Sequence, residues 1–306
     1  VDKLLNVEEL IDALDKAFAD DGSVPQKTQL FVPQVDGSTN KVLLMPAWGK
    51  MMGVKTLTIA PTNVKRDIPT LQSTYQLLDK QTGETLCFMD AALLTNRRTA
   101  AASALASKYL SRPDASVLLM MGCGSLAPEL IKAHCVVRPI TKVLVWARNE
   151  EKSQAFVESL DLPNVEVMVA EDIVVGMAEA DIISCATLSS NPLIFGKLLR
   201  PGQHVDLAGS YKADMRESDD AVVEQCALFI DVFSNLRETG DFAIPLKSGV
   251  ISESDIRADL HELCKKEVAG RLSAEQITLF KSCGYALEDL VAAELVWEGS
   301  NLESHG

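Results

Sequence analysis

A glycine turn at residues 122–127 is the first feature of the sequence that could do chemistry. Gly122, Gly124 and Ala127 form the pattern Gly-x-Gly-x-x-Ala between an apolar run and a segment of helical periodicity. The first glycine permits a tight turn, the second lets a phosphate approach the backbone, and a small third residue lets helix and strand pack closely. The N–H groups that begin the helix then face the negative charge. A strand before the turn and a second strand ending about 25 residues later complete the context. The pattern predicts a dinucleotide site.

The residues after that second strand bear on which dinucleotide binds. NAD sites usually place Asp or Glu there to bond the ribose hydroxyls. Here the first polar residues are Arg148 and Asn149, and arginine suits the 2′-phosphate of NADP(H) through charge-assisted bonds. The alternative is that Arg148 is a solvated loop residue and that Glu150 or Glu151 reaches the ribose. We expect NADPH to be preferred over NADH, with Arg148 and Asn149 as cofactor contacts.

Cations in the first third of the chain form a second group of interest. Lys55 stands in a strand-like run that is otherwise apolar or hydroxylic, and charged residues are rarely buried without a partner. Arg97 and Arg98 stand in or near the first turn of an expected helix over 93–110, where cations oppose the helix dipole. These residues bind an anionic ligand or form an internal salt bridge, with Asp90 or Asp67 as possible partners. The residue types alone leave both readings open.

Composition excludes several classes of protein. The 306 residues contain 29 Lys and Arg against 43 Asp and Glu, a net charge of −14, which weighs against nucleic-acid or anionic-membrane partners. Seven cysteines without a Cys-x-x-Cys pair indicate reduced thiols in a cytoplasmic protein. Four histidines without metal-ligand spacing make a metal enzyme improbable. No apolar stretch is long enough to span a bilayer, and the N-terminus reads as an amphipathic helix rather than a signal peptide.

The middle of the chain alternates short apolar strands with helical segments. Near-continuous Val, Ile and Leu strands between helices indicate a parallel sheet covered on both faces. The predicted fold class is α/β, with a doubly wound Rossmann-type domain over 113–284. Its expected strands are 116–121, 142–147, 165–170, 181–186, 204–209 and 228–232, and its expected helices include 125–137, 150–160 and 171–179.

The remainder of the chain differs from this pattern. A first helix precedes strand-like segments separated by Asp36-Gly37 and Thr82-Gly83, which are hairpin signals. Residues 1–112 therefore predict a mixed or antiparallel sheet domain. Pro113 stops the preceding helix and sets the boundary at Ser111–Asp114. A further amphipathic helix is expected from about residue 285.

These blocks together resemble the ornithine cyclodeaminase/mu-crystallin family, which also contains archaeal-type alanine dehydrogenases and cyclic ketimine reductases. The resemblance runs almost end to end. It rests on GVKTLTIAPTN, the block from IPTLQSTYQLL to NRRTAAASALA, GCGSLA, ATLSSNPLI, GSYKADMRESDD and FKSCGYALEDLVAAEL. It implies a Rossmann domain beside a domain for dimerisation and substrate binding, to which the C-terminal helix at 285–306 returns, and hence a homodimer.

The resemblance also assigns roles to residues. Lys55 matches the active-site lysine, and Arg98 matches the arginine that clamps a substrate carboxylate and is counted among the cofactor contacts. Thr70 matches a threonine at the nicotinamide half of the cofactor, and Cys283 a substrate contact. The further implied cofactor contacts are Gly122, Gly124, Ser125, Leu126, Thr187, Leu207 and Ser282.

Two positions depart from the family pattern. Lys27 stands where many members carry a second carboxylate-binding arginine, and a lysine supplies charge without a bidentate fork. Ser210 stands where cyclodeaminases carry an aspartate that engages the amino group of an open-chain diamino acid. A serine at this position resembles mu-crystallin and the cyclic ketimine reductases.

The resemblance thus implies an NAD(P)H-dependent reductase whose partner is a small cyclic imino acid. The first expected reaction converts Δ1-pyrroline-2-carboxylate to L-proline, and the second converts the six-membered piperideine analogue to L-pipecolate. Lys55 and Ser210 are the expected catalytic residues, and Lys27, Arg98 and Cys283 join Lys55 in binding substrate. Ornithine cyclodeaminase, a dehydrogenase acting on pyruvate and ammonia, and a non-enzymatic binding protein remain as alternatives.

Overall fold

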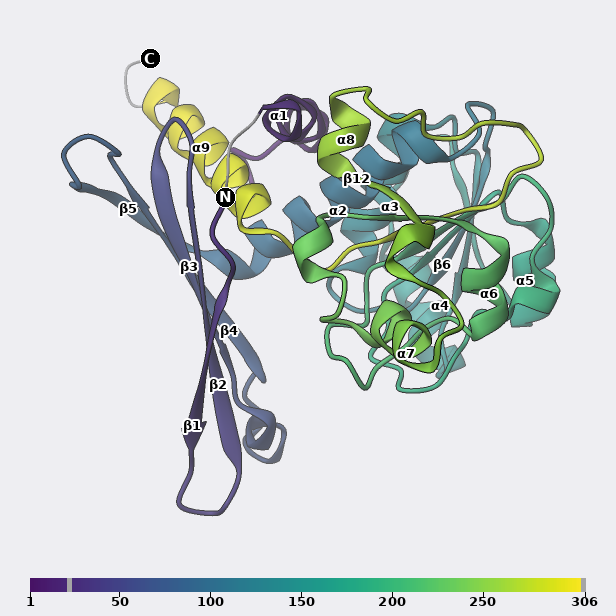
Figure 1. Ribbon diagram of the computed structural model, residues 1–306, viewed down its shortest axis with the longest axis horizontal. Coiled ribbons are helices and arrows are strands. Elements are labelled where there is room, and N and C mark those ends of the chain that lie inside the picture. The colour runs from purple at the N-terminus through teal and green to yellow at the C-terminus, as the bar shows by residue number, and fades with distance from the viewer. Residues whose placement is uncertain (21–23, 304–306) are drawn as a thin grey trace. The chain divides into compact units, whose positions relative to one another are not determined.

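The chain divides into two compact units, each with its own sheet (Figure 1). The structure, a computed structural model, describes residues 1–20 and 24–303. Unit 1 comprises Val1–Arg98 and Tyr285–Gly306, and unit 2 comprises Thr99–Gly284. The division falls inside a helix, before the boundary that the sequence predicts at Ser111–Asp114. Within the described residues, no helix is both long enough and apolar enough to cross a membrane.

The sheet of unit 1 is antiparallel, and its strands follow one another in chain order. The expected hairpins form at Asp36-Gly37 and Thr82-Gly83, where both glycines have a positive φ. The fourth strand has no clear signal in the sequence, because Gln72, Ser73 and Thr74 interrupt its apolar pattern. The strands are β1 (Thr28–Pro33), β2 (Thr39–Trp48), β3 (Met52–Ile59), β4 (Leu71–Leu78) and β5 (Thr85–Asp90), with a 3-10 turn η1 (Pro61–Arg66) after β3.

Two helices complete unit 1. The side chain of Asn6 caps α1 (Val7–Ala19) by accepting from the N–H groups of Glu8 and Glu9. Helix α9 (Ala286–Glu303) packs against α1 and against β2, β3 and β4. This packing places the first turn of α9 over the middle of β3, and the candidate site below depends on it.

Helix α2 (Ala91–Leu110) begins earlier than the sequence suggests. The carboxylate of Asp90 accepts from the N–H of Ala92 at 2.8 Å and so caps the helix start. Arg97 and Arg98 therefore lie beyond the first turn. The prediction that they oppose the dipole of a helix N-terminus is wrong.

Unit 2 is built on a parallel sheet of eight strands in the described part of the chain, which confirms the predicted α/β class. Its order is β12-β11-β13-β10-β9-β6-β7-β8, so the winding direction reverses between β6 and β9. Ligands of doubly wound sheets bind at such a switch point, beyond the carboxyl ends of the strands. The strands are β6 (Val117–Met121), β7 (Lys142–Trp146), β8 (Glu166–Val169), β9 (Ile182–Cys185), β10 (His204–Leu207), β11 (Ala227–Ile230), β12 (Ile256–Asp259) and β13 (Thr278–Lys281).

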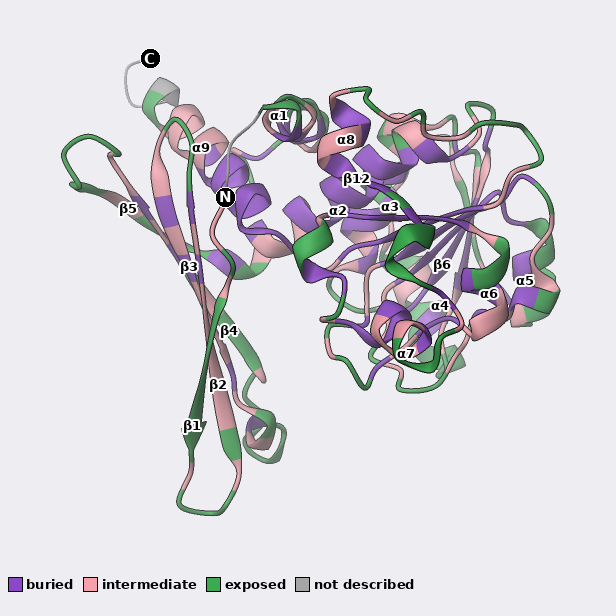
Figure 2. Ribbon diagram, viewed as in Figure 1, coloured by how far each residue is buried: buried purple, intermediate pink, exposed green. Residues whose placement is uncertain are grey.

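The six strands predicted for this region are all present, and β12 and β13 were missed because Arg257, Asp259 and Lys281 interrupt their apolar pattern. Figure 2 shows the central strands of this sheet buried. The helices and turns of unit 2 are α3 (Ala127–Val137), α4 (Glu150–Ser159), α5 (Ile173–Glu179), η2 (Gly196–Leu198), α6 (Asp220–Gln225), η3 (Phe233–Asn235), α7 (Gly240–Ser248), η4 (Glu253–Asp255) and α8 (Leu260–Cys264).

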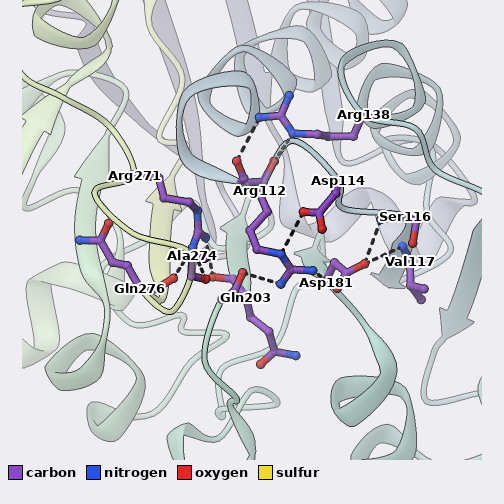
Figure 3. A network of polar contacts seen from close by, with 12 residues as sticks. Arg112, Asp114, Ser116, Val117, Arg138, Asp181, Gln203, Arg271, Ala274 and Gln276 are labelled. Carbon is purple, nitrogen blue, oxygen red and sulfur yellow. Dashed lines mark hydrogen bonds and ion pairs between the residues drawn. The ribbon is translucent and has the colours of Figure 1, made fainter.

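Arginines hold the amino ends of the central strands (Figure 3). Arg112 donates to the Asp181 carboxylate at 2.7 Å, and the second oxygen of that carboxylate accepts from Ser116 N–H at 2.9 Å. Arg271 donates to the carbonyl oxygens of Leu110 and Gln203, at 2.7 and 3.1 Å. These bonds satisfy carbonyls at the end of α2 and at the start of β10. The arginines at this edge of the sheet have a structural role, and none of the predicted site residues lies there.

Candidate active site

Lys55 and Arg98 meet at one pair of carboxylates in unit 1. Lys55 Nζ lies 2.8 Å from Asp289 Oδ1 and 2.7 Å from Asp289 Oδ2. Arg98 Nε donates to Asp289 Oδ1 at 2.9 Å, and Arg98 Nη1 donates to Glu288 Oε2 at 2.6 Å. Internal salt bridges are therefore present, but the partners are Asp289 and Glu288 on α9 rather than Asp90 or Asp67.

Burial governs the charge of this cluster. The side chains of Lys55, Glu288 and Asp289 are at most 1% exposed, and that of Arg98 is 7% exposed. Burial and the nearby Arg98 charge lower the pKa of Lys55 to about 8, against the pull of Asp289 in the opposite direction. Lys55 thus changes its charge close to neutral pH, which suits a group that exchanges a proton with a ligand.

Two other predicted residues of unit 1 lie at different distances from Lys55. Lys27 immediately precedes β1, and the register of β1, β2 and β3 places it in the row that contains Met45 and Lys55. Two strand spacings put the backbones of Lys27 and Lys55 roughly 10 Å apart. Thr70 lies at the other end of β3, where its carbonyl accepts from the N–H of Ala60 at 2.8 Å.

The glycine turn of unit 2 has the backbone that the sequence predicts. Gly122 has φ 112°, and a Cβ there would lie 2.6 Å from the carbonyl oxygen of Ala186. A Cβ on Gly124 would meet no described atom within 4 Å, so the space beside this residue is open. Helix α3 then starts at Ala127 without a side-chain cap on its N–H groups, next to Ser125 and Leu126. An open approach and uncapped helix N–H groups fit the pyrophosphate of a dinucleotide.

Arg148 and Asn149 follow β7 on the same edge of the sheet. Asn149 caps α4, because its Oδ1 accepts from the N–H of Lys152 at 2.8 Å. Arg148 is exposed and forms no ion pair with any residue that the structure describes. An exposed guanidinium without an internal partner is suited to meeting a ligand phosphate.

The remaining predicted residues of unit 2 also cluster at the carboxyl ends of the strands. Thr187 follows β9, Leu207 ends β10, and Ser282 and Cys283 follow β13. Ser282 N–H donates to the Leu207 carbonyl at 3.0 Å, and Cys283 N–H donates to Asp231 Oδ2 at 2.5 Å. The neighbouring order β13-β10-β9 places these residues on adjacent loops.

Ser210 occupies an environment that sequence reasoning did not foresee. Its hydroxyl donates to the carboxylate of Asp241 on α7, and Lys281 Nζ donates to its carbonyl oxygen at 3.0 Å. Glu217 accepts from the N–H of Ser210 at 3.2 Å. These three charged residues are fully buried, and none was singled out from the sequence. Glu217 lies in a block that carried the family resemblance, but nothing in its spacing marked it as a neighbour of Ser210.

No group of three or more His, Cys, Asp or Glu side chains within the described residues is placed to hold a metal ion. The predicted site residues lie in the Lys55 cluster of unit 1 and at the carboxyl edge of the sheet in unit 2.

Comparison with protein families matches residues 1–304 to the ornithine cyclodeaminase/mu-crystallin family. The chain belongs to this family. A relative named Δ1-pyrroline-2-carboxylate reductase, from Colwellia psychrerythraea, is 38% identical over 300 residues, which cover 96% of this chain and 95% of the relative.

Solved structures agree in fold with the family. The Δ1-pyrroline-2-carboxylate reductase of Thermococcus litoralis, in complex with NADH and L-proline, matches with a TM-score of 0.92 and 32% identity, covering 99% of this chain and 96% of the other. An archaeal alanine dehydrogenase dimer with bound NAD matches with a TM-score of 0.91 and 25% identity, covering 99% of this chain and 94% of the other.

Proposed function

We propose that this protein is an NAD(P)H-dependent reductase of a small cyclic ketimine carboxylate. The first substrate is Δ1-pyrroline-2-carboxylate, reduced to L-proline, and the six-membered piperideine analogue is the second. The observation that carries the proposal is the buried Lys55–Arg98 pair in a chain with a dinucleotide turn at Gly122–Ala127. Relatives named for this reaction support it.

The cofactor is assigned to the carboxyl edge of the unit 2 sheet. The N–H groups near Gly124, Ser125 and Leu126 receive the pyrophosphate, and Arg148 with Asn149 meets the adenosine ribose or its 2′-phosphate. The nicotinamide, when bound, supplies the hydride that the imine carbon accepts. The further cofactor contacts assigned from the family pattern are Thr70, Arg98, Gly122, Thr187, Leu207 and Ser282.

The substrate carboxylate is assigned to the cations of unit 1. Arg98 offers the planar fork that matches a carboxylate, Lys55 adds a second charge, and Lys27 supplies a more distant one. Because its pKa is lowered to about 8, Lys55 is also suited to managing a proton at the ring nitrogen. Cys283 is assigned as a further substrate contact.

Ser210 argues against the lyase chemistry found elsewhere in the family. An open-chain diamino acid brings a distal ammonium, and burying such a charge without a partner costs several kcal/mol. A cyclic ketimine has no distal ammonium, so a serine at position 210 suffices for it. The same residue therefore favours imine reduction over ornithine deamination.

A single assay panel tests the proposal. NADPH and NADH oxidation is followed with Δ1-pyrroline-2-carboxylate, with Δ1-piperideine-2-carboxylate and with pyruvate plus ammonia, and ammonia release is followed with ornithine. We expect the cyclic imines to give the highest kcat/KM and ornithine to release no ammonia. Faster turnover of pyruvate plus ammonia, or ammonia release that rivals imine reduction, contradicts the proposed function.

We also infer a homodimer formed through the sheet of unit 1. Every residue of β1 is exposed, and large apolar side chains lie uncovered on this sheet. The strand register places Phe88, which is 71% exposed, on the same face as the exposed Leu30 and Trp48, and Phe31, which is 62% exposed, on the opposite face. Exposed apolar patches of this kind mark protein interfaces.

The seven cysteines, all at described positions, are free thiols, which suits a reducing compartment such as the cytoplasm.

Sedimentation equilibrium tests the dimer. The variant carrying Phe31→Glu and Phe88→Glu is expected to sediment as a monomer, because it places a charge on each face of the sheet, whichever face the second subunit covers. Leu272→Glu is the matched control, since Leu272 is an equally uncovered apolar residue of unit 2, 65% exposed. A wild-type monomer, or a dimer that survives both phenylalanine substitutions, contradicts the inferred interface.

A further inference from the structure

Three buried charged residues around Ser210 have no role in the proposed function. Glu217, Asp241 and Lys281 are each fully buried, yet they lie near the loops that follow β9, β10 and β13. Burying charges is costly, and such groups persist where each finds several partners. Their partners therefore indicate what they do.

Glu217 joins two of the loops. One carboxylate oxygen accepts from Thr187 N–H at 2.7 Å and from Thr187 Oγ1 at 2.8 Å. The other oxygen accepts from the N–H groups of Gly209 and Ser210, at 2.9 and 3.2 Å. A Cβ on Gly209 would lie 2.1 Å from Thr187 N, so the two loops approach as closely as a glycine allows.

Lys281 holds the same loops from below. Its ammonium donates to the carbonyls of Leu207 and Ser210, at 3.1 and 3.0 Å, and lies 3.5 Å from Asp241 Oδ2. Burial lowers the pKa of Lys281, but the negative charges of Asp241 and Glu217 outweigh it and hold that pKa above its usual value. The ammonium is therefore charged, and its charge balances one of the two acids.

Asp241 determines the direction of one hydrogen bond. Its Oδ1 accepts from the N–H groups of Glu217 and Ser218, at 2.8 and 3.1 Å, and its Oδ2 accepts from the Ser210 hydroxyl. Because Oδ1 already accepts two backbone N–H groups and the Lys281 ammonium faces Oδ2, the carboxylate is the acceptor and the Ser210 hydroxyl donates the proton that they share. With that proton committed to Asp241, the Ser210 oxygen can only accept from any further partner.

We propose that Asp241 is a positioning residue that fixes the Ser210 hydroxyl as a hydrogen-bond acceptor for the N–H of a protonated cyclic imine. The inference rests on the proposed function. A protonated imino acid carries its only N–H at the ring nitrogen, while its carboxylate can only accept. A hydroxyl that donates to a carboxylate is also a stronger acceptor, because hydrogen bonds in a chain polarise one another.

The arrangement also accounts for the serine itself. The carboxylate of Asp241 is one hydrogen bond away from the side chain at position 210. The group that contacts the substrate is therefore a neutral hydroxyl, which the carboxylate orients and polarises. A ring iminium needs an oriented acceptor, whereas a distal ammonium needs a charge in contact with it. Selectivity for cyclic imines over diamino acids thus depends on the Ser210–Asp241 pair and not on Ser210 alone.

Asp241→Asn reverses this hydrogen bond with little change of shape. The two backbone N–H groups of Glu217 and Ser218 keep the amide oxygen on their side, so the amide nitrogen faces Ser210. Ser210 then accepts from the amide and turns its own proton outward, toward the imine N–H. We expect kcat for Δ1-pyrroline-2-carboxylate to fall roughly 10- to 100-fold, the range for losing a hydrogen bond to a charged group.

A double-mutant cycle separates positioning from a general structural role. In the Ser210→Ala background, Asp241→Asn is expected to change kcat less than about threefold, because the hydroxyl through which it acts is gone. An equal loss of kcat in both backgrounds contradicts the proposal. Thermal denaturation of each variant, with and without NADH, establishes that it is folded and binds cofactor.

The pH dependence of kcat gives a readout that a structural defect does not move. An acceptor at the imine N–H favours the protonated imine in the complex, so its loss shifts the basic limb of kcat to lower pH. A tenfold weaker stabilisation corresponds to a shift of about one pH unit. Ser210→Ala must show the same shift, Ser210→Thr must restore the limb, and these two variants suffice if Asp241→Asn does not fold.

The matched control is a second buried serine–aspartate pair, which lies within the sheet of unit 2. Ser184 Oγ donates to Asp206 Oδ2 at 2.7 Å, in the middle of β9 and β10. Asp206→Asn is expected to lower Tm and leave the basic limb unmoved. If wild-type protein reduces the imine but the basic limb of kcat lies at the same pH in the Asp241 and Ser210 variants, this inference fails and the proposed function stands. If wild-type protein reduces no cyclic imine, the proposed function itself fails.

Discussion

Lys55 and Arg98 bind the same carboxylate, that of Asp289. With Glu288 on the other side of Arg98, the cluster holds two formal positive and two formal negative charges. It therefore has no excess positive charge waiting for an anion. A substrate carboxylate must compete with α9 for the donors of Lys55 and Arg98, so binding and the internal ion pairs are linked.

Arg98→Lys is predicted to reduce kcat/KM for Δ1-pyrroline-2-carboxylate by about 10- to 100-fold, or 1.5–3 kcal/mol of transition-state binding. Lysine keeps the charge but cannot span Asp289 and Glu288 while offering a fork to the substrate. Arg97→Lys is the control, because Arg97 directly precedes Arg98 in α2 and pairs with Asp2 instead. If Arg98→Lys lowers Tm and leaves kcat/KM unchanged, Arg98 is structural only.

The pH dependence of activity is predicted to report Lys55. Its pKa of about 8 lies below the ordinary lysine value, so the ammonium loses its proton as the pH rises through about 8. We expect kcat/KM for imine reduction to fall above that pH in the wild type. In Lys55→Arg the fall is expected to weaken, because a guanidinium stays charged. The substrate ionises in the same way in assays of both proteins. If wild type and Lys55→Arg therefore show identical pH profiles of kcat/KM, the titration of Lys55 does not control the reaction.

Cofactor preference is predicted to depend on Arg148. We expect a lower KM for NADPH than for NADH in the wild type, and about a tenfold or greater rise in the NADPH value alone in Arg148→Ala, the loss of one charge-assisted contact. Lys247→Ala, which removes an exposed cation from the last turn of α7, controls for net charge. If Arg148→Ala does not alter the preference between NADPH and NADH, Arg148 is a solvated loop residue and not a cofactor contact.

Ser210→Asp is predicted to lower both stability and the reductase rate. The new carboxylate would contact that of Asp241 inside a fully buried site that already holds Glu217. An uncompensated buried charge costs about 3–5 kcal/mol. Ser210→Asn has a similar shape without the charge and should lose less in Tm. Equal Tm values for the two variants, measured by calorimetry, would contradict the electrostatic explanation.

Local sequence signals predicted the elements of the fold that depend on neighbouring residues. The Asp36-Gly37 and Thr82-Gly83 hairpins and the Gly122 turn each depend on residues a few positions apart. The predicted strands of unit 2 were found because short, near-continuous apolar runs between helical segments are typical of a parallel sheet buried on both faces. Strand β13 was missed because its sequence, TLFK, begins with a polar residue and ends in a charged one.

The partners of the site residues were harder to predict than the residues themselves. Lys55 was singled out because a charge in an apolar strand is unusual, and the family pattern gave Arg98. Asp289 lies 234 residues from Lys55, and no local rule connects them. Asp241, likewise 31 residues from Ser210, reaches it only because α7 folds back under the loop after β10. Sequence spacing carries no record of such contacts.

The position of β13 bears on how the chain folds during synthesis. This strand is the last of its sheet to leave the ribosome, yet it pairs with β10 on one side and β11 on the other. Until residues 278–281 emerge, β11 and β12 have no edge to join, and the nascent sheet ends at β10. Contacts this distant in sequence slow folding because long loops must close first. The sheet of unit 2 therefore cannot be completed before the segment that contains β13 has been synthesised. A chain truncated before β13 would leave the hydrogen-bonding edges of β10 and β11 unpaired and prone to aggregation.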